Sequence, residues 1–435
     1  MKTDISIYKT AFENQVNALN GSLNEAFKEK KKNALEDFEK TGLPSSKVES
    51  WKYSNLAAWT KGNFTPVEDI PVSNPKIQSP VLGMKKVNLI VLSNGNINQE
   101  ASKIIDQNLI LSSVQEELKS SEGKAFIEKY IDSIENHETE PLHLLNTAFL
   151  KDALFLKIKA GKIIEHPVVI VHHFDAIPEN GIVQNRSIID VGENAQVKFA
   201  EYFESKNAAT FLYNDLQEIF VNASARVEWY RLENENCPGI HVQSQKVKQE
   251  KNSYFKSWSF IKDVQKLRNN TYVQLTGPFA ETNIYGLSFQ NGKSHADNHI
   301  LVDHAVEDCQ SNQLFKGTYN DNSTAVFNGK VLVRKDAQRT NAFQSNKNLL
   351  LSEKATINSK PELEIYADDV KCSHGATTGQ MNEDQLFYLQ ARGIEKEKAK
   401  AILNQAFLSE VLDYISIPEL KNHLKDYFNQ CFETA

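Results

Sequence analysis

Cysteine is scarce in this 435-residue sequence, and its four cysteines, Cys237, Cys309, Cys372 and Cys431, lie far apart along the chain. There is no Cys-x-x-Cys pair and no dense framework of the kind that staples small secreted domains. The chain therefore has no local four-cysteine cage for a structural zinc ion or a permanent iron–sulfur cluster. We interpret the cysteines as reduced thiols, and the predicted compartment is the cytoplasm.

Long apolar runs are also missing. The first 20 residues mix lysine, aspartate and glutamate with apolar residues, and they lack the uninterrupted apolar segment of a secretory signal. No later run approaches the roughly 18 apolar residues that cross a bilayer. Residues 167–171, for example, end at His172. The sequence therefore predicts no membrane segment.

Neither sign of charge dominates the chain. It has 49 Lys and Arg against 56 Asp and Glu, a formal net charge of -7, and the two signs are mixed along its length. Because no basic stripe is present to neutralise phosphates, nucleic acid is excluded as a partner. The 40% hydrophobic content is that of a globular chain with room for two or three structural regions.

The N-terminal third is predicted to be mainly helical. Apolar residues recur at near-helical spacing between residues 5 and 41, and Gly42-Leu43-Pro44 then stops the helix. A short apolar run at 87–92 indicates a strand. Residues 104–130 are predicted to be helical again.

The middle of the chain changes to short runs rich in Val, Ile, Phe and Tyr, separated by polar turns. These predicted strands are residues 154–171, 196–203, 225–232, 254–261 and 298–302. Three segments start alike, Ala195-Gln196-Val197, Ala225-Arg226-Val227 and Ala355-Thr356-Ile357, which indicates a repeated strand and turn unit. Periodicity alone leaves a sandwich, a barrel and a solenoid open.

The C-terminal end carries clear helix signals. Asn382 has the position of an N-cap with Gln385 as its reciprocal partner, and Arg392-Gly393 stops that helix. A second helix is predicted over 395–414, and Pro418 opens a third. The apolar face of the second helix consists of Ala399, Ile402, Leu403, Phe407 and Val411. This face either packs on its own domain or receives a partner.

Two motifs resemble a nucleotide-binding loop and a metal site, but their residue spacing fits neither site well. Gly292-Lys293-Ser294 looks like the end of a nucleotide-binding loop, yet five residues separate it from Gly286 where four are required, so a polar turn is favoured. His295, His299 and His304 lie in a predicted strand, where positions four apart share a face and positions five apart do not. A metal site built from these three histidines is therefore disfavoured.

Residues 366–377 form the chemically richest segment, with a thiol, an imidazole and paired carboxylates. Cys372 and His374 lie two positions apart, so in an extended chain both project to one side and could hold a metal ion together. Two other interpretations stay open. One is a nucleophilic Cys–His pair, for which no oxyanion hole or third group is recognisable. The other is a polar loop that leads into the C-terminal helices.

Three segments resemble the SufB/SufD family of iron–sulfur cluster assembly proteins. The run from Asp368 to Ile394, DDVKCSHGATTGQMNEDQLFYLQARGI, is similar to the family's C-terminal signature. The N-terminal ESWKYSNL at 49–56 and the segment from FNGKV at 327–331 to Leu351 are similar to two further family motifs, in the same order. Gly375 after the histidine, and Leu389 where SufB has a cysteine, favour the SufD branch over SufB.

This resemblance implies a mainly β fold with helical ends. It implies a right-handed parallel β-helix over residues 151–377, flanked by an α-rich region over 1–150 and a helical subdomain over 378–435. The expected function is that of a non-catalytic scaffold subunit, which pairs with a SufB-type paralogue through the β-helices. The C-terminal helices, with Leu386, Phe387 and Tyr388, are expected to dock the SufC-type ATPase. A homodimer is expected when the paralogue is absent.

The resemblance also implies a site. His374 corresponds to the family histidine at the interface with the paralogue and is expected to bind a transient iron–sulfur cluster or iron. Cys372 is expected to support it, and Asp368 and Asp369 are weaker candidates. The chain is expected to hold no permanent cofactor, to contribute to iron acquisition, and to meet reduced flavin only in the whole complex. The alternatives from other classes are a β-helix polysaccharide-active enzyme and a self-assembling structural protein.

Overall fold

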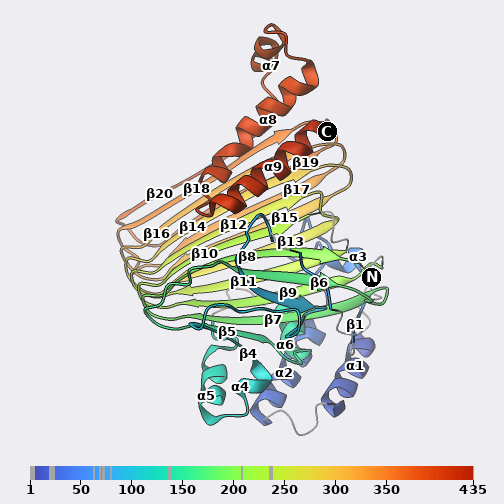
Figure 1. Cartoon of the computed structure of the whole chain (residues 1–435), viewed down its shortest axis with the longest axis vertical. Coiled ribbons are helices and arrows are strands. Elements are labelled where there is room, and N and C mark those ends of the chain that lie inside the picture. The colour runs from blue at the N-terminus through green and yellow to red at the C-terminus, as the bar shows by residue number, and fades with distance from the viewer. Residues whose placement is uncertain are drawn as a thin grey trace.

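The computed structural model of the chain describes residues 5–18, 25–61, 64–67, 70, 74–78, 81–134, 140–206, 209–234 and 239–434. Its centre is a parallel β-solenoid of about seven turns with helices at both termini (Figure 1). The predicted parallel β-helix with helical ends is confirmed, and the sandwich and barrel alternatives are excluded. Cys237 and the side chain of Cys431 lie outside the described residues, whereas Cys309 and Cys372 are free thiols.

The N-terminal third is mainly helical, as predicted, but short strands interrupt it. The helices are α1 (Ile5–Ala18), α2 (Glu25–Thr41), the 3-10 turn η1 (Glu49–Trp51), α3 (Leu56–Trp59), α4 (Val114–Glu117), α5 (Ser121–Tyr130) and α6 (Pro141–Ala148). The strands are β1 (Thr65–Pro66), β2 (Asn88–Ser93), β3 (Asn96–Ile97) and β4 (Leu109–Ser113). The helix predicted over 104–130 is wrong in its first half, because Leu109 is buried in the main core and β4 pairs with the first strand of the solenoid.

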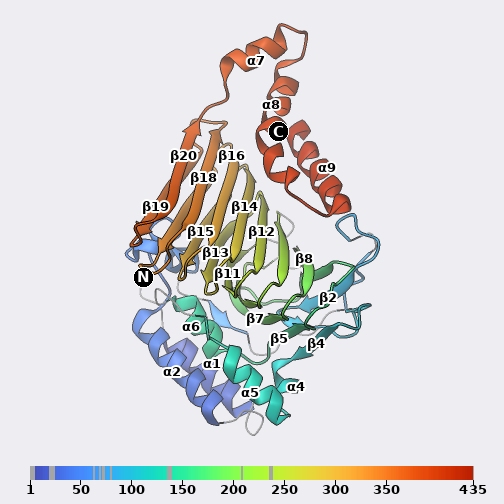
Figure 2. The same ribbon diagram turned by 90° about the vertical axis from the view of Figure 1, so that its left-hand side faces the viewer.

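Two parallel sheets face each other and enclose the interior of the solenoid, which we call the lumen (Figure 2). The β19 sheet, named after its last strand, contains β4, β5 (Leu154–Ile158), β7 (Gly181–Val191), β9 (Leu212–Val221), β11 (Ile240–Gln249), β13 (Lys266–Leu275), β15 (His295–His304), β17 (Thr324–Val333) and β19 (Thr356–Ile365), with β1 pairing at β7. The β20 sheet contains β3, β2, β6 (Val168–Phe174), β8 (Gln196–Ser205), β10 (Arg226–Glu233), β12 (Tyr254–Lys262), β14 (Glu281–Gln290), β16 (Gln310–Tyr319), β18 (Thr340–Leu350) and β20 (Val370–Gly379).

Two of the three repeated strand starts of the sequence stack on one another. Gln196 of β8 pairs with Arg226 of β10, and Val197 pairs with Val227. The third start, at Ala355, opens β19 in the opposite sheet. Because the register is parallel, residues in one column share a face, and alternate residues of every strand point into the lumen. The boundaries predicted at residues 150 and 377 stay predictions, although β2 and β4 already belong to the two sheets.

In the lumen, a large side chain on one strand lies beside a glycine on the neighbouring strand. A Cβ atom added at Gly286 of β14 would lie 2.1 Å from the ring of Phe315 on the next strand of the sheet. Phe315 is itself buried in the main core, together with Trp229 and Phe327. Protein interiors are close-packed, so the glycine makes the space that the aromatic ring occupies.

The glycine-lysine-serine motif is a turn between stacked strands, as favoured from its spacing. Gly292 has φ of 64°, a left-handed conformation that suits glycine. Its backbone N–H donates to the carboxylate of Asp321 in the next turn, at 3.0 Å. The position that a phosphate would need is therefore taken by a carboxylate of the chain itself.

The C-terminal helices are α7 (Glu383–Gln390), α8 (Lys396–Asp413) and α9 (Pro418–Thr434). The predicted N-cap is confirmed, since the Asn382 side chain accepts from the backbone N–H of Gln385, and Gly393 ends the turn after α7 with φ of 85°. The second half of α8, together with α9, lies against the outer face of the β20 sheet (Figure 2). Among the helices described, none is long and apolar enough to cross a membrane.

The packing of α8 corrects the predicted apolar face. Ala399 and Val411 are fully buried, but Ile402 is 36% exposed, because α8 reaches the sheet only toward its C-terminal end. There the rings of Tyr230, Trp258 and Tyr285 stack down the outer face of the sheet, and Tyr414 continues the stack with a centroid distance of 4.8 Å from Tyr285. The appendage is therefore anchored by its second half.

We predict that Gly286→Ala lowers the free energy of unfolding by about 1–3 kcal/mol, the usual cost of overpacking a filled core. Urea denaturation measures the change. Gly379→Ala on β20 is the matched control, because a Cβ atom there meets nothing within 4 Å. Equal urea midpoints for Gly286→Ala and the control would contradict the close packing of the lumen.

Candidate functional site

Within the described chain, no further strand pairs on the outer edge of the last turn of the solenoid. Strands β19 and β20 stand at the ends of their sheets, and each pairs on one edge only. The side chains of β20 are partly or fully exposed along its whole length. Unpaired strand edges present rows of free N–H and C=O groups that another strand can meet. This end of the solenoid, which we call the open end, therefore gives access to the lumen. Its free strand edges are also suited to pairing with a strand of another chain.

Cys372 and His374 lie at this open end and face the lumen. Cys372 pairs in register with Ala342 of β18, and His374 pairs with Gln344. Gln344 is only 4% exposed and points inward, so the residue above it in the same column points the same way. The expectation that the thiol and the imidazole share one side of the strand agrees with this register.

The two side chains differ in exposure. Cys372 is half-buried, and burial raises the pKa of its thiol, which therefore carries its proton near neutral pH. His374 is exposed at the rim. A metal ion that bound here would displace the thiol proton and gain one sulfur and one nitrogen ligand. Within the described residues, no group of three or more His, Cys, Asp and Glu side chains could hold a metal ion, so the pair is an incomplete ligand set.

Asp368 and Asp369 lie outside this pair. Both are exposed in the turn before β20, and the backbone of Asp369 bonds to Gln338 and Arg339 in the neighbouring turn. Within the described residues, neither carboxylate belongs to a group of three or more His, Cys, Asp and Glu side chains that could hold a metal ion. The structure therefore does not bring these carboxylates to the imidazole.

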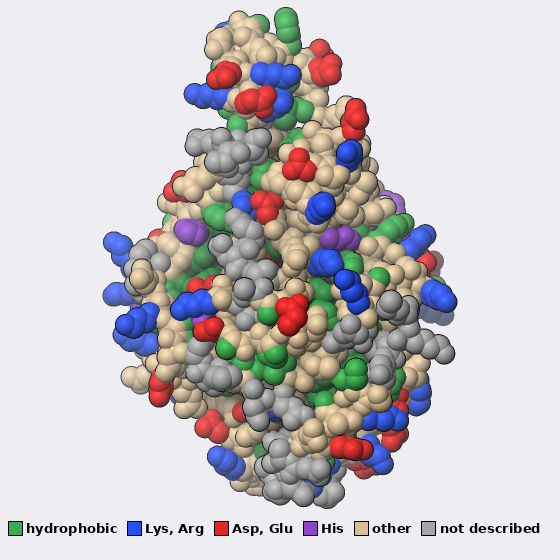
Figure 3. Space-filling view, turned by 90° about the vertical axis from the view of Figure 1, so that its right-hand side faces the viewer, with side chains coloured by type: hydrophobic (Ala, Val, Ile, Leu, Met, Phe, Trp, Pro, Cys, Tyr) green, Lys and Arg blue, Asp and Glu red, His purple; other side chains and the backbone are tan. Residues whose placement is uncertain are grey.

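The residues predicted to meet a partner lie on the projecting part of the appendage. Phe387 and Tyr388 of α7 are 71% and 58% exposed, whereas Leu386 is half-buried. Leu386 lines a groove of about 750 Å³ between the last turns of the solenoid and the start of α8, together with Leu351 and Met381. Figure 3 shows this projection as a knob at the top, with charged and hydrophobic side chains on its surface.

The three histidines of β15 are not brought together. His295 and His299 lie on the outer face of the β19 sheet, whereas His304 points into the lumen and bonds to Ser311 at 2.8 Å. Burial lowers the pKa of His304 to about 4, so this histidine is neutral. The outer pair packs near the N-terminal motif, where Ser54 lies 2.8 Å from His295 and 2.5 Å from Asp297.

Ser54, His295 and Asp297 are the residue types of a hydrolytic triad, but their arrangement is different. The Ser54 hydroxyl is fully buried and donates to Asp297 directly, and the histidine paired with Asp297 is His299, at 3.1 Å, so Asp297 does not orient the imidazole of His295. Arg268 donates to Asp297 at 3.1 Å and lies under the ring of Trp51 at 4.1 Å. The cluster therefore docks the N-terminal motif on the β19 sheet.

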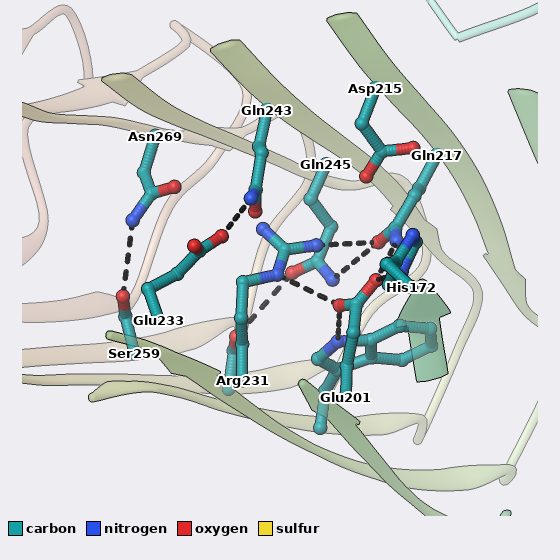
Figure 4. A network of polar contacts seen from close by, with 12 residues as sticks. His172, Glu201, Asp215, Gln217, Arg231, Glu233, Gln243, Gln245, Ser259 and Asn269 are labelled. Carbon is teal, nitrogen blue, oxygen red and sulfur yellow. Dashed lines mark hydrogen bonds and ion pairs between the residues drawn. The ribbon is translucent and has the colours of Figure 1, made fainter. Parts of the chain in front are cut away.

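A buried polar network fills the lumen deeper in the solenoid (Figure 4). At its centre the carboxylate of Glu201 on β8 accepts hydrogen bonds from His172, Gln217, Trp229 and Arg231, at 2.6, 2.7, 3.0 and 2.8 Å. Gln217 comes from the β19 sheet and the other three from the β20 sheet, so the network ties the two sheets together.

Charge balance explains why the network is tolerated. Burial alone would raise the pKa of Glu201, but Arg231 and the bond from His172 outweigh burial and lower it to about 2. Burial and the nearby Glu201 charge raise the pKa of Asp215 to about 6. The sequence analysis missed these residues, although charged positions such as Glu201 and Arg231, inside otherwise apolar strands, were an available signal.

The comparisons with known proteins agree with this architecture. Residues 2–170 match the SufBD protein N-terminal region, and residues 174–407 match the SUF system FeS cluster assembly SufBD core domain. The chain belongs to the SufBD family. Its open last turn, with Cys372 and His374, lies within the matched SufBD core domain, which continues to residue 407.

Relatives of the SufBD family cover nearly the whole chain. An iron–sulfur cluster assembly SufBD family protein of Synechocystis is 28% identical over 391 residues, 88% of this chain and 86% of the relative. The iron–sulfur cluster assembly protein SufD of Escherichia coli is 28% identical over 392 residues, 90% and 89% of the two chains. SufD of Bacillus subtilis is 24% identical over 424 residues, 90% of each chain. The resemblance seen in the motifs is confirmed.

We predict that Arg231→Leu lowers the free energy of unfolding by about 3–5 kcal/mol, because it leaves the Glu201 carboxylate buried without its main counter-charge. The double variant Arg231→Leu with Glu201→Leu should lose less than the single variant. Urea denaturation of both, beside the exposed control Arg226→Leu on the same strand, tests this. A double variant less stable than Arg231→Leu would contradict the assigned charge balance.

Proposed function

We propose that this SufBD chain is a non-catalytic scaffold subunit for iron–sulfur cluster assembly, working in the cytoplasm. The observation that carries the proposal is the open last turn of the solenoid, which places Cys372 and His374 at the mouth of the lumen. The nascent cluster or iron is cargo, and the chain holds no cofactor of its own. The carboxylates of the lumen, such as Glu201, are closed off from solvent, which disfavours the polysaccharide-active alternative.

Pairing with a SufB-type paralogue would occur at the same open end. The free edges of β19 and β20 offer backbone groups, and Phe343, Ile365 and Tyr366 near them are 46%, 39% and 63% exposed. Exposed apolar side chains beside an unpaired edge favour association with another β-structure. A second copy of this chain could occupy the surface when the paralogue is absent.

The partner would complete the ligand set. One thiolate and one imidazole leave an iron ion or a small cluster with open positions, which groups across the interface can fill. A site split between two chains opens when the interface opens. Such a site can release its cargo, which suits assembly better than a closed cage.

A SufC-type ATPase would dock on α7 and the start of α8. The projecting Phe387 and Tyr388 supply the exposed apolar contact, and large aromatics commonly anchor protein interfaces. The second half of α8 is fixed to the β20 sheet, where Lys316 donates to the carbonyl of Phe407 and pairs with Glu410 at 2.5 Å. Movement of the docked partner would therefore be transmitted to β16, two strands from β20 in the sheet.

We predict that His374→Ala, co-expressed with the SufB- and SufC-type partners, still forms the complex but loses most of its anaerobic cluster content. The reason is the loss of the only imidazole at the mouth of the lumen among the residues described. Iron and sulfide content and the visible absorption of the purified complex measure it. Ser373→Ala, one position away and on the other face of β20, is the control. Normal cluster content in His374→Ala would remove this residue from the proposal.

We predict that Phe387→Ala with Tyr388→Ala weakens binding of the ATPase at least tenfold, since truncated aromatic anchors typically cost 2 kcal/mol or more, roughly a factor of 30. Titration calorimetry with the purified ATPase measures the affinity. Phe279→Ala is the matched control, because Phe279 is 61% exposed in a distant turn of the solenoid. Unchanged affinity in the α7 variant would place the docking surface elsewhere.

A further inference from the structure

Two glutamines continue inward from His374 in one column of the β20 sheet. Gln344 of β18 pairs in register with His374, and Gln313 of β16 pairs with Gln344. Both glutamines are buried, at 4% and 0% exposure. The side-chain N–H of Gln344 donates to the side-chain oxygen of Gln313 at 2.9 Å. The column is therefore a short ladder of amides that leads to the mouth of the lumen.

The opposite sheet leaves room for this ladder. Gly329 of β17 faces Gln344 across the lumen, and a Cβ atom added at Gly329 would lie 2.1 Å from Nε2 and 2.9 Å from Cδ of Gln344. A side chain at position 329 would thus push the glutamine aside. The absence of a side chain at Gly329 leaves the space that the Gln344 amide occupies, so the amide packs directly against the backbone of β17.

Two atoms of the ladder, Oε1 of Gln344 and Nε2 of Gln313, are buried without a hydrogen-bond partner among the described residues. The Oε1 atom of Gln344 is buried and accepts no hydrogen bond within the described structure. An unsatisfied buried acceptor costs roughly 1–3 kcal/mol. In a parallel amide ladder each group donates to one neighbour and accepts from the other, and Gln344 already donates to Gln313. The remaining neighbour in its column is His374, whose imidazole carries an N–H group.

We infer that Gln344 is a positioning residue for His374. Its side-chain oxygen accepts the N–H of one imidazole nitrogen, which fixes the tautomer and turns the other nitrogen, with its free lone pair, toward the mouth. A carbonyl partner of this kind commonly orients a histidine for metal binding. The positioning role of Gln344 is argued from the register between β18 and β20, the unpartnered Oε1 atom of Gln344 and the space at Gly329. Only the identity of the metal or cluster that the free nitrogen binds rests on the proposed function.

The test uses the full chain alone, with histidine labelled by ¹⁵N in the ring. At mildly alkaline pH, where a histidine ring is neutral, ring ¹⁵N shifts report the tautomer, and comparison with His374→Ala identifies the signals. The wild type should show one tautomer, and Gln344→Leu a mixture. Gln344→Glu, which keeps an acceptor, should restore the single tautomer. Gln310→Leu, an exposed glutamine on β16, is the control.

A second readout separates this inference from the proposed function. Cobalt(II) added to the same chain, followed by its visible absorption, should bind about tenfold more weakly to Gln344→Leu than to the wild type, the usual minimum cost of removing an orienting group. A single tautomer without cobalt binding would overturn the metal role and keep the positioning. An unchanged tautomer in Gln344→Leu, with all variants folded by circular dichroism, would overturn the positioning whatever the metal does.

Discussion

Backbone pairing between successive turns is the interaction on which the rest of this protein depends. Every strand of the solenoid from β7 to β18 bonds to a strand before it and a strand after it, so each turn is both supported and supporting. The regular register, for example Gln196 beside Arg226, aligns side chains in columns about 30 residues apart in sequence. The pairing has to stop somewhere, and where it stops the chain leaves two strand edges and the mouth of the lumen.

The interior of the solenoid holds two different kinds of polar group, buried charges in one part and neutral or metal-binding side chains at the open end. In its N-terminal half, Glu201 and Arg231 are buried together and neutralise each other, and Gln217 of the opposite sheet bonds to both, which ties the two sheets. Toward the open end the lumen keeps neutral amides, Gln313 and Gln344, and ends with a thiol and an imidazole. Charge is thus enclosed where solvent is absent, and groups able to bind metal are placed where solvent and a partner can reach them.

Local signals in the sequence predicted the elements that depend on neighbours in the chain. Asn382 caps α7 as its position indicates, and the repeated starts at Gln196 and Arg226 are paired strands. Residues 109–113 were mistaken for helix because their burial depends on β5, far along the chain. The charges of Glu201 and Arg231 were visible inside apolar strands, but which residues they contact, and that Gln344 neighbours His374, depend on the register between strands. The motif resemblance identified Cys372 and His374 as site residues, and the structure shows that both side chains face the lumen.

The position of α8 and α9 has a consequence for how the protein is made. The stacked rings of Tyr230, Trp258 and Tyr285 on the outer face of the β20 sheet are covered by helices that follow all the solenoid strands in the sequence. During translation, the solenoid can grow turn by turn while this aromatic surface is still bare. It stays so until α8 and α9 leave the ribosome, and over that interval the nascent chain exposes an apolar surface that favours association with other chains.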